Sequence, residues 1–277
     1  MTEWMVESSQ LSDVGQKRPH NEDYVGCYEP GQMTELEAHG RLYVLADGVG
    51  GAAAGEVASE YTVNTIMYTY YQQTAGGDPQ VRLRRAIEEA NAEVFAQNLR
   101  RSNQSEMATT VVAAVIQGDR LTVANVGDSR AYVIRGDTIE QITEDHSLMA
   151  EMISGGIITD EEAETHPYRN VILRSVGAYE NVQVDVFSRQ LAPGDVLILC
   201  SDGLTRLVKN HELVSTVHAY APAEAARQLV ALANERGGDD NITVSITRIS
   251  PQTIQESQRS TAGQRPEKPR WENLQPL

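Results

Sequence analysis

The sequence is poor in cysteine, in basic residues and in long apolar runs. Its 277 residues include two cysteines, Cys27 and Cys200, and no CxxC pair, which argues against a disulfide framework and a thiolate zinc site. The longest apolar run, 111–116, is far shorter than the roughly 20 residues that cross a bilayer. The first residues lack the basic and apolar segments of a secretory signal. We therefore expect a cytoplasmic protein without a membrane partner.

Acidic residues strongly outnumber basic residues. Lys and Arg total 23 against 39 Asp and Glu, and the formal net charge is -16. Because nucleic-acid binding needs basic groups against phosphates, we expect no nucleic acid as a partner. The same imbalance argues against attraction to anionic lipid. Excess acid is compatible with high solubility and with a carboxylate cluster that holds cations.

The sequence divides into a body, 1–249, and a tail, 250–277. The residues from 251 onward contain four of the ten prolines and no apolar periodicity, a composition typical of a disordered extension. Within the body, 146–180 has Gly155, Gly156 and a Glu-rich run between short helical pieces. We interpret this segment as a mobile flap inserted between strands.

Short β-branched or apolar runs bounded by Gly, Asp or Asn predict strands. These runs are 41–46, 109–116, 121–126, 131–135, 196–200 and 242–249. The turns 117–120 and 135–137 predict hairpins. Apolar residues at helical spacing predict three helices, over 54–68, 83–94 and 226–233. The first helix would present one apolar stripe, formed by Ala54, Val57, Ala58, Tyr61, Thr65 and Tyr68.

The order of these elements indicates the fold class. Helices interrupt the strands in pairs and do not alternate with them, which argues against a doubly wound parallel sheet. We predict an α+β fold in which helices cover antiparallel sheets.

Five aspartates share one feature, which is their position beside a predicted strand or, for the first of them, before the apolar pair Tyr24 and Val25. They are Asp23, Asp47, Asp128, Asp202 and Asp240, and Glu22 precedes the first of them. Strand ends can aim side chains into a shared cleft, where carboxylates repel one another unless cations neutralise them. Oxygen ligands favour Mg²⁺ or Mn²⁺. Two such ions about 3.5–4 Å apart can share a water and lower its pKa, and Gly48 would let its carbonyl approach an ion.

Each of these residues also has an ordinary interpretation. An Asp-Gly pair after a strand, as at Asp47 and Asp202, is most often a turn. Arg18 could clamp a phosphate, because its guanidinium fork matches phosphate oxygens, or it could be a surface arginine. Only the joint pattern of the acids favours a metal site.

Eight motifs occur in an order that is specific to one family. They are SDVGQKRPHNED (12–23), VLADGVGG (44–51), ATTVVAAVI (108–116), NVGDSRAYVIR (125–135), EDHSL (144–148), HPYRNVILRSVG (166–177), LILCSDGLT (197–205) and GGDDNITV (237–244). In these motifs the chain resembles the metal-dependent serine/threonine protein phosphatases of type 2C, bacterial branch, over 12–249. The resemblance implies a four-layer α/β/β/α sandwich of two antiparallel sheets with helices outside. It also implies hydrolysis of phosphoserine and phosphothreonine in proteins by a metal-bridged hydroxide.

The resemblance assigns the central residues. Asp47 would bridge two central Mn²⁺ or Mg²⁺ ions, with the Gly48 carbonyl on one of them. Asp202 and Asp240 would hold the second ion. Together with Arg18, which would bind the substrate phosphate, these three aspartates form the implied catalytic set.

The resemblance also assigns an outer set of residues. Glu22 and Asp23 would be direct or water-mediated metal ligands. Asp128 would hold a third ion, and Asp202 would be a ligand of both the second and the third ion. The segment 146–180 would be the flap beside the site.

One departure from the family concerns the turn after Asp47, DGVGGAAAGE. Many bacterial relatives carry a histidine just after this turn and animal relatives carry one within it, as the proposed general acid for the leaving group, whereas Val49 and Ala52 stand here. A metal-bound water, on the third ion, could substitute for it. His20 and His166 are other candidates, although we interpret both as structural.

The resemblance implies phosphorylated proteins as partners, including eukaryotic-like Ser/Thr kinases, and we expect a monomer. One alternative is a regulatory phosphatase dedicated to a single anti-anti-sigma-type partner, against which broad hydrolysis of phosphopeptides would argue. The other is a pseudophosphatase, a binding module that has lost its metals. The joint presence of the five aspartates argues against that alternative.

Overall fold

The structure, a computed structural model, describes residues 4–49, 53–72, 77–100 and 107–251. The strands of one sheet are β1 (Trp4–Asp13), β7 (Arg130–Arg135), β8 (Thr138–Gln141), β10 (Val196–Cys200) and β11 (Ile242–Pro251). Those of the other sheet are β2 (Asp23–Tyr28), β3 (Arg41–Val49), β4 (Ala108–Thr109), β5 (Val111–Gln117), β6 (Arg120–Val126) and β9 (Asp185–Gln190). The helices are α1 (Met33–His39), α2 (Ala53–Gln72), α3 (Pro79–Arg100), α4 (Leu148–Ser154), α5 (Asp160–Glu164), α6 (Asp202–Thr205), α7 (Asn210–Ala219) and α8 (Pro222–Glu235).

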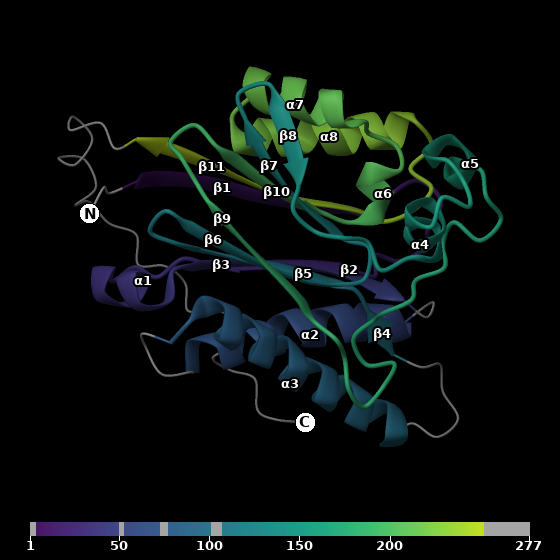
Figure 1. The fold of residues 1–277 in the computed structure, drawn as a ribbon, viewed down its shortest axis with the longest axis horizontal. Helices are drawn as coiled ribbons and strands as arrows, with labels where there is room; N and C mark the ends of the chain where they lie inside the picture. Colours follow the sequence, from purple (N-terminus) through teal and green to yellow (C-terminus); the bar gives the residue numbers. More distant parts are fainter. Residues whose placement is uncertain (1–3, 50–52, 73–76, 101–106, 252–277) are drawn as a thin grey trace.

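Two sheets lie face to face between two helical layers (Figure 1). The first sheet has the strand order β1-β11-β10-β7-β8, and the second has β2-β3-β5-β6-β9 with β4 paired to β3. All of these strand pairs are antiparallel. The predicted α+β, four-layer sandwich is therefore confirmed. In the described part of the chain, no helix is both long and apolar enough to cross a membrane.

The core consists of three apolar layers. One lies between the second sheet and helices α2 and α3, one between the two sheets, and one between the first sheet and helices α7 and α8. Each sheet is thus covered on both faces, so its central strands are apolar at consecutive positions. All five residues of β10 are buried, which explains why such strands appear in the sequence as continuous apolar runs.

All six predicted strands are present, and both predicted hairpins join their strands. The run 109–116 is divided between β4 and β5. The list of predicted elements did not include β1, β2, β8 and β9, nor helices α1, α6 and α7. Strand β1 lies at the edge of its sheet, where none of its residues is fully buried, so its sequence carries a weak apolar signal.

The predicted apolar stripe of α2 is wrong at two positions. Val57 is 42% exposed and Tyr68 is 52% exposed, whereas Val63, Ile66 and Tyr70 are completely buried. Apolar residues occupy much of the circumference of this helix, so their spacing alone did not determine which face meets the sheet.

The last strand runs beyond the predicted end of the body at 249. Strand β11 continues to Pro251, which pairs with Trp4 of β1. The rest of the predicted tail, 252–277, lies outside the described residues. We propose that the folded body ends at Pro251.

A chain that ends at Pro251 is expected to keep the stability of the full chain, with its free energy of unfolding changed by no more than about 0.5 kcal/mol. A matched chain that ends at Val244 loses much of β11, which lies between β1 and β10, and should not fold. Urea unfolding followed by circular dichroism measures both. A loss of more than about 1 kcal/mol in the first chain would show that the tail packs on the body.

Candidate metal centre and flap pocket

The acidic residues singled out in the sequence meet at one end of the sandwich. Asp23, the first residue of β2, pairs directly with Asp47 of β3. Asp202 follows β10, and Asp240 precedes β11. These two strands are neighbours in the other sheet. The two sheets therefore contribute carboxylates from opposite sides to one place, at the end where α4 and α6 lie (Figure 1).

A buried serine connects the two sheets at this point. The Ser201 hydroxyl donates to Asp23 Oδ2 over 2.8 Å and accepts from the backbone N–H of Thr243 over 3.0 Å. Ser201 is completely buried, so the bond fixes the orientation of the Asp23 carboxylate. Sequence reasoning missed this role, although a serine directly before Asp202 was visible.

Asn241 is a second residue that sequence reasoning missed. Its Oδ1 accepts from the backbone N–H of Glu22 over 2.8 Å. Its Nδ2 donates to the carbonyls of Val14 and His20, both over 2.9 Å. Asn241, which directly precedes β11, thereby holds the loop that carries Arg18 and Glu22 next to the start of that strand. The side chain of His20 itself is exposed.

The backbone of Asp47 is held on both sides. Its carbonyl accepts from Thr109 Oγ1 over 2.8 Å, and its N–H donates to Thr110 Oγ1 over 3.1 Å. The next residue must be glycine, because a Cβ on Gly48 would lie 2.4 Å from the Gly55 carbonyl oxygen and 2.6 Å from that of Glu22. Only glycine permits this close approach of two backbone segments beside the acids.

The loop that carries Asp128 is fixed by His146, a member of the EDHSL motif. The N–H of Gly127 donates to His146 Nδ1 over 3.0 Å, and the N–H of His146 donates to the Gly127 carbonyl over 2.9 Å. A backbone N–H can only donate, so Nδ1 is the acceptor and Nε2 carries the proton toward Asp185 Oδ2, 3.0 Å away. Burial lowers the pKa of His146, in agreement with a neutral ring.

The carboxylates raise one another's pKa values. Burial raises the pKa of Asp23 to about 7, the nearby hydroxyls of Thr243 and Ser201 oppose the rise, and the charge of Asp202 adds to it. Burial likewise raises the pKa of Asp128 to about 7, and the charge of Asp202 adds to the rise. The pKa of Asp47 lies well above its ordinary value, first through burial and then through the charges of Asp23, Asp202 and Asp128. So many neighbouring acids carry their full negative charge only when cations neutralise them.

Two observations test whether these residues suit metal ions. Asp23 Oδ1 and Asp128 Oδ1 are buried without a hydrogen-bond partner among the described residues, and an unsatisfied buried carboxylate oxygen is costly. The donor set consists of oxygens, which suit Mg²⁺ and Mn²⁺. In their present orientations, no three of the described acidic, histidine or cysteine side chains are close enough together to hold a metal ion. Two of the acids pair with arginines instead, Asp240 with Arg18 over 2.9 Å and Asp202 with Arg206.

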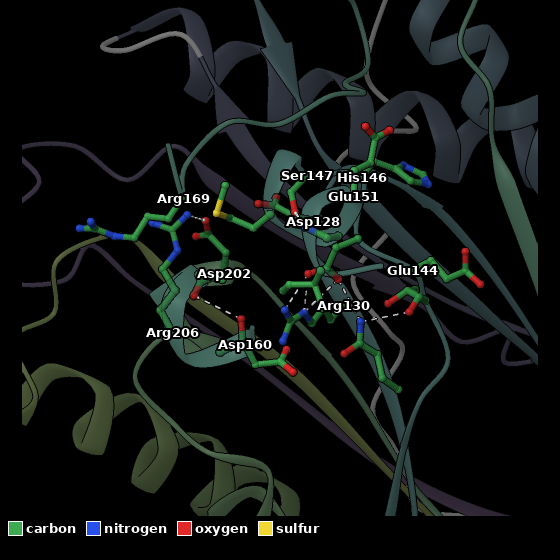
Figure 2. A pocket seen from close by; sticks show the side chains of 18 of the residues that line it. Asp128, Arg130, Glu144, His146, Ser147, Glu151, Asp160, Arg169, Asp202 and Arg206 are labelled. Atoms are coloured by element: carbon green, nitrogen blue, oxygen red, sulfur yellow. Dashed lines mark hydrogen bonds and ion pairs between the residues drawn. The ribbon is translucent and has the colours of Figure 1, made fainter. Parts of the chain in front are cut away.

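A cavity of about 1180 Å³ lies beside the acids. Asp128, Asp202 and Arg206 line it on one side, and residues of α4 and α5 line it on the other. Figure 2 shows the charged side chains directed into this space. The segment predicted as a flap, 146–180, therefore borders the acidic site, with Arg169 and Arg174 at the cavity wall. We name this space the flap pocket.

The family model for protein phosphatase 2C matches residues 19–235 of the chain. The chain belongs to this family. Among the relatives of this phosphatase, the serine/threonine phosphatase stp of Listeria innocua is 37% identical over 84% of the chain and 92% of the relative. The protein phosphatase PhpP of Streptococcus pneumoniae is also 37% identical, over 88% of the chain and 98% of the relative.

Solved structures of the family share the fold of this phosphatase. The serine/threonine phosphatase PstP/Ppp of Mycobacterium tuberculosis has a TM-score of 0.79 at 34% identity, over 88% of the chain and 99% of that structure. A catalytic domain of PstP, described as a complex with two manganese ions, has a TM-score of 0.78 at 32% identity, over 90% of the chain and all of that domain. The phosphatase described here is thus a metal-dependent protein serine/threonine phosphatase.

The phosphatase brings together every residue that the sequence singled out for the site. They are Arg18, Glu22, Asp23, Asp47, Gly48, Asp128, Asp202 and Asp240. Glu22 is buried, and burial raises its pKa. In the turn that lacks a histidine, Val49 is the last residue of β3, whereas Ala52 lies outside the described residues.

Proposed function

We propose that this phosphatase removes phosphate from phosphoserine and phosphothreonine side chains at the acidic cluster, with Asp47, Asp202, Asp240 and Arg18 as the catalytic set. The observation that supports this proposal is the meeting of five aspartates from both sheets, with buried carboxylate oxygens of Asp23 and Asp128 left without partners. When bound, Mn²⁺ or Mg²⁺ ions would supply the charge that offsets these acids and would lower the pKa of the attacking water.

The central ions would be held by Asp47, the Gly48 carbonyl, Asp202 and Asp240. Asp47 would be the ligand common to both ions, as the family resemblance implies, and its buried carboxyl lies among Asp23, Asp202, Asp128 and Asp240, whose charges all act on it. Its backbone is immobilised by Thr109 and Thr110.

The outer ligands would be Glu22, Asp23 and Asp128. The buried bond from Ser201 holds Asp23 in one orientation and leaves its second oxygen free to face an ion. Glu22 is held through its backbone N–H by Asn241. Asp128 would hold the third ion together with Asp202, since burial raises the pKa of Asp128 and the charge of Asp202 is the next cause of that rise.

Arg18 would bind the phosphoryl oxygens of the substrate. Its guanidinium lies 2.9 Å from Asp240 Oδ2, and 44% of its side chain is exposed. Arg18 therefore lies beside a proposed metal ligand and is also accessible to a phosphate that enters from solvent. A planar guanidinium can hold two phosphate oxygens at once.

The attack on phosphorus would come from water, without a phosphoenzyme. Cys200 is completely buried, and burial raises the pKa of its thiol to about 12, so it is not a nucleophile near neutral pH. His146 has both ring nitrogens engaged.

The flap pocket would receive the protein chain on either side of the phosphorylated residue. It borders Asp202 directly and is larger than a phosphate needs. Phosphorylated proteins are the substrates of this phosphatase, and we propose that eukaryotic-like Ser/Thr kinases are among them. We further propose that it acts as a monomer in the cytoplasm, where Cys27 and Cys200 stay reduced. Size-exclusion chromatography with light scattering would test the monomer.

Exhaustive chelation is expected to abolish turnover of a phosphothreonine peptide, because the carboxylates lose the cations that they need. Added Mn²⁺ or Mg²⁺ should restore it, whereas Zn²⁺ should not sustain turnover, since the proposed ligands are all oxygens. Steady-state rates with each ion measure this. Full activity in the chelated protein would overturn the proposed role of the acidic cluster.

A further inference from the structure

One arginine of the flap pocket differs from its neighbours in the acid that it contacts. Arg130 binds Asp145, and Arg174 binds Asp185, so both pair with acids outside the proposed metal centre. Arg206 pairs instead with Asp202. Figure 2 shows the Arg206 side chain turned toward that carboxylate.

The position of Arg206 follows from the short helix α6. Asp202 is the first residue of this helix, and Arg206 follows its last residue. The two are therefore one turn apart, and the backbone N–H of Arg206 donates to the Asp202 carbonyl over 3.0 Å. At this spacing the side chains lie on the same face, which places the guanidinium against the Asp202 carboxylate.

The charge of Arg206 also reaches Asp128. Asp128 is 7% exposed, and its Oδ1 has no hydrogen-bond partner in the described part of the chain. Asp128, Asp202 and Arg206 line the flap pocket together. One guanidinium thus partly neutralises both acids of the third site.

We propose that Arg206 is a resident counter-ion of the third metal site, and that a cation binds to Asp128 and Asp202 only when this guanidinium leaves. The inference rests on the third site named under the proposed function. Arg206 can leave, because 31% of its side chain is exposed and the flap pocket lies beside it. The third ion would have two carboxylates, and one of them is held by Arg206, whereas Asp47, which the central ions would share, has no arginine partner among the described residues.

Calorimetric titration of the full-length phosphatase with Mn²⁺ tests the proposal by counting ions and measuring their affinities. In Arg206→Gln, the affinity of the third Mn²⁺ is expected to rise by at least ~10-fold, because the competing charge is gone. The central affinities should change less. In Arg206→Lys, which keeps the charge, the third affinity should stay close to that of the wild type.

Two further variants serve as controls. Arg227→Gln removes the same charge from a surface pair with Glu224 on α8 and should leave all affinities unchanged. Arg206→Gln combined with Asp128→Ala should lose the third ion. Circular dichroism confirms that each variant is folded.

The outcomes separate this inference from the proposed function. An unchanged or weakened third affinity in Arg206→Gln would overturn the role of Arg206. Two bound ions and never a third, in any variant, would overturn both that role and the assignment of Asp128, while the central site would stand. Absence of Mn²⁺ binding altogether would overturn the proposed function itself.

Discussion

Replacement of Asp47 by asparagine is expected to abolish phosphatase activity while the fold survives. Asp47 is the proposed bridging residue, and its loss weakens both central ions at once. Loss of a group that only supports a metal ligand typically costs 10–100-fold in affinity or activity. The loss in kcat at saturating Mn²⁺ should therefore exceed ~100-fold, both with a phosphothreonine peptide and with p-nitrophenyl phosphate.

The same variant offers a readout of folding. Asp47 lies among acids whose charges raise its pKa, so the neutral asparagine removes repulsion. In chelator, Asp47→Asn should therefore be at least as resistant to urea as the wild type, and Mn²⁺ should stabilise it less. Asp202→Asn should lose activity in the same way.

Asp137→Asn is the matched control. It makes the same chemical change on a side chain that is completely exposed, in the turn between β7 and β8, and should retain wild-type kcat. An Asp47→Asn enzyme with wild-type kcat at saturating metal would refute the assignment of the bridging residue.

Replacement of Asp128 by alanine is expected to impair one class of substrate selectively. A serine or threonine alkoxide needs a proton as it leaves, whereas p-nitrophenolate hardly does. The turn after Asp47 has no histidine to supply that proton, and we propose that the Asp128 site serves the leaving group instead. General-acid effects are typically 10²–10⁴-fold, so kcat for the phosphothreonine peptide should fall by at least ~100-fold. The loss for p-nitrophenyl phosphate should stay below ~10-fold.

The reverse change provides the companion variant. Ala52→His places an imidazole in the turn that lacks one and should raise peptide turnover modestly, by no more than ~100-fold. Measurement of kcat for both substrates in both variants decides the matter. Equal losses on the two substrates in Asp128→Ala would show that the third site does not serve the leaving group, and the acid would then lie in the flap.

The sequence predicted most of the fold because its signals are local. A strand buried on both faces, such as 196–200, is an unbroken apolar run, and a hairpin such as 117–120 is marked by its own turn residues. Edge strand β1 has no such run, and in α2 the apolar residues surround the helix. Which face of α2 is buried therefore depended on the sheet and on α3, not on spacing.

The acids of the site were predictable for the same reason. Each aspartate stands at or within two residues of a strand end, and eight motifs in family order linked them to one chemistry. Their partners were not predictable. The Ser201–Asp23 bond joins residues 178 positions apart, and the Arg18–Asp240 pair joins residues 222 positions apart.

The sequence by itself therefore determined the family and the antiparallel sandwich, and it singled out the acids that we propose for the site, because these depend on residue types at strand ends. Only the tertiary structure decided what holds those acids. In the tertiary structure, Ser201 is hydrogen-bonded to Asp23, Asn241 to the backbone of Glu22, and His146 to the loop that carries Asp128. Arg206 forms an ion pair with Asp202. These contacts depend on how two sheets and a flap segment pack together, and that packing is not visible in the local sequence around each residue.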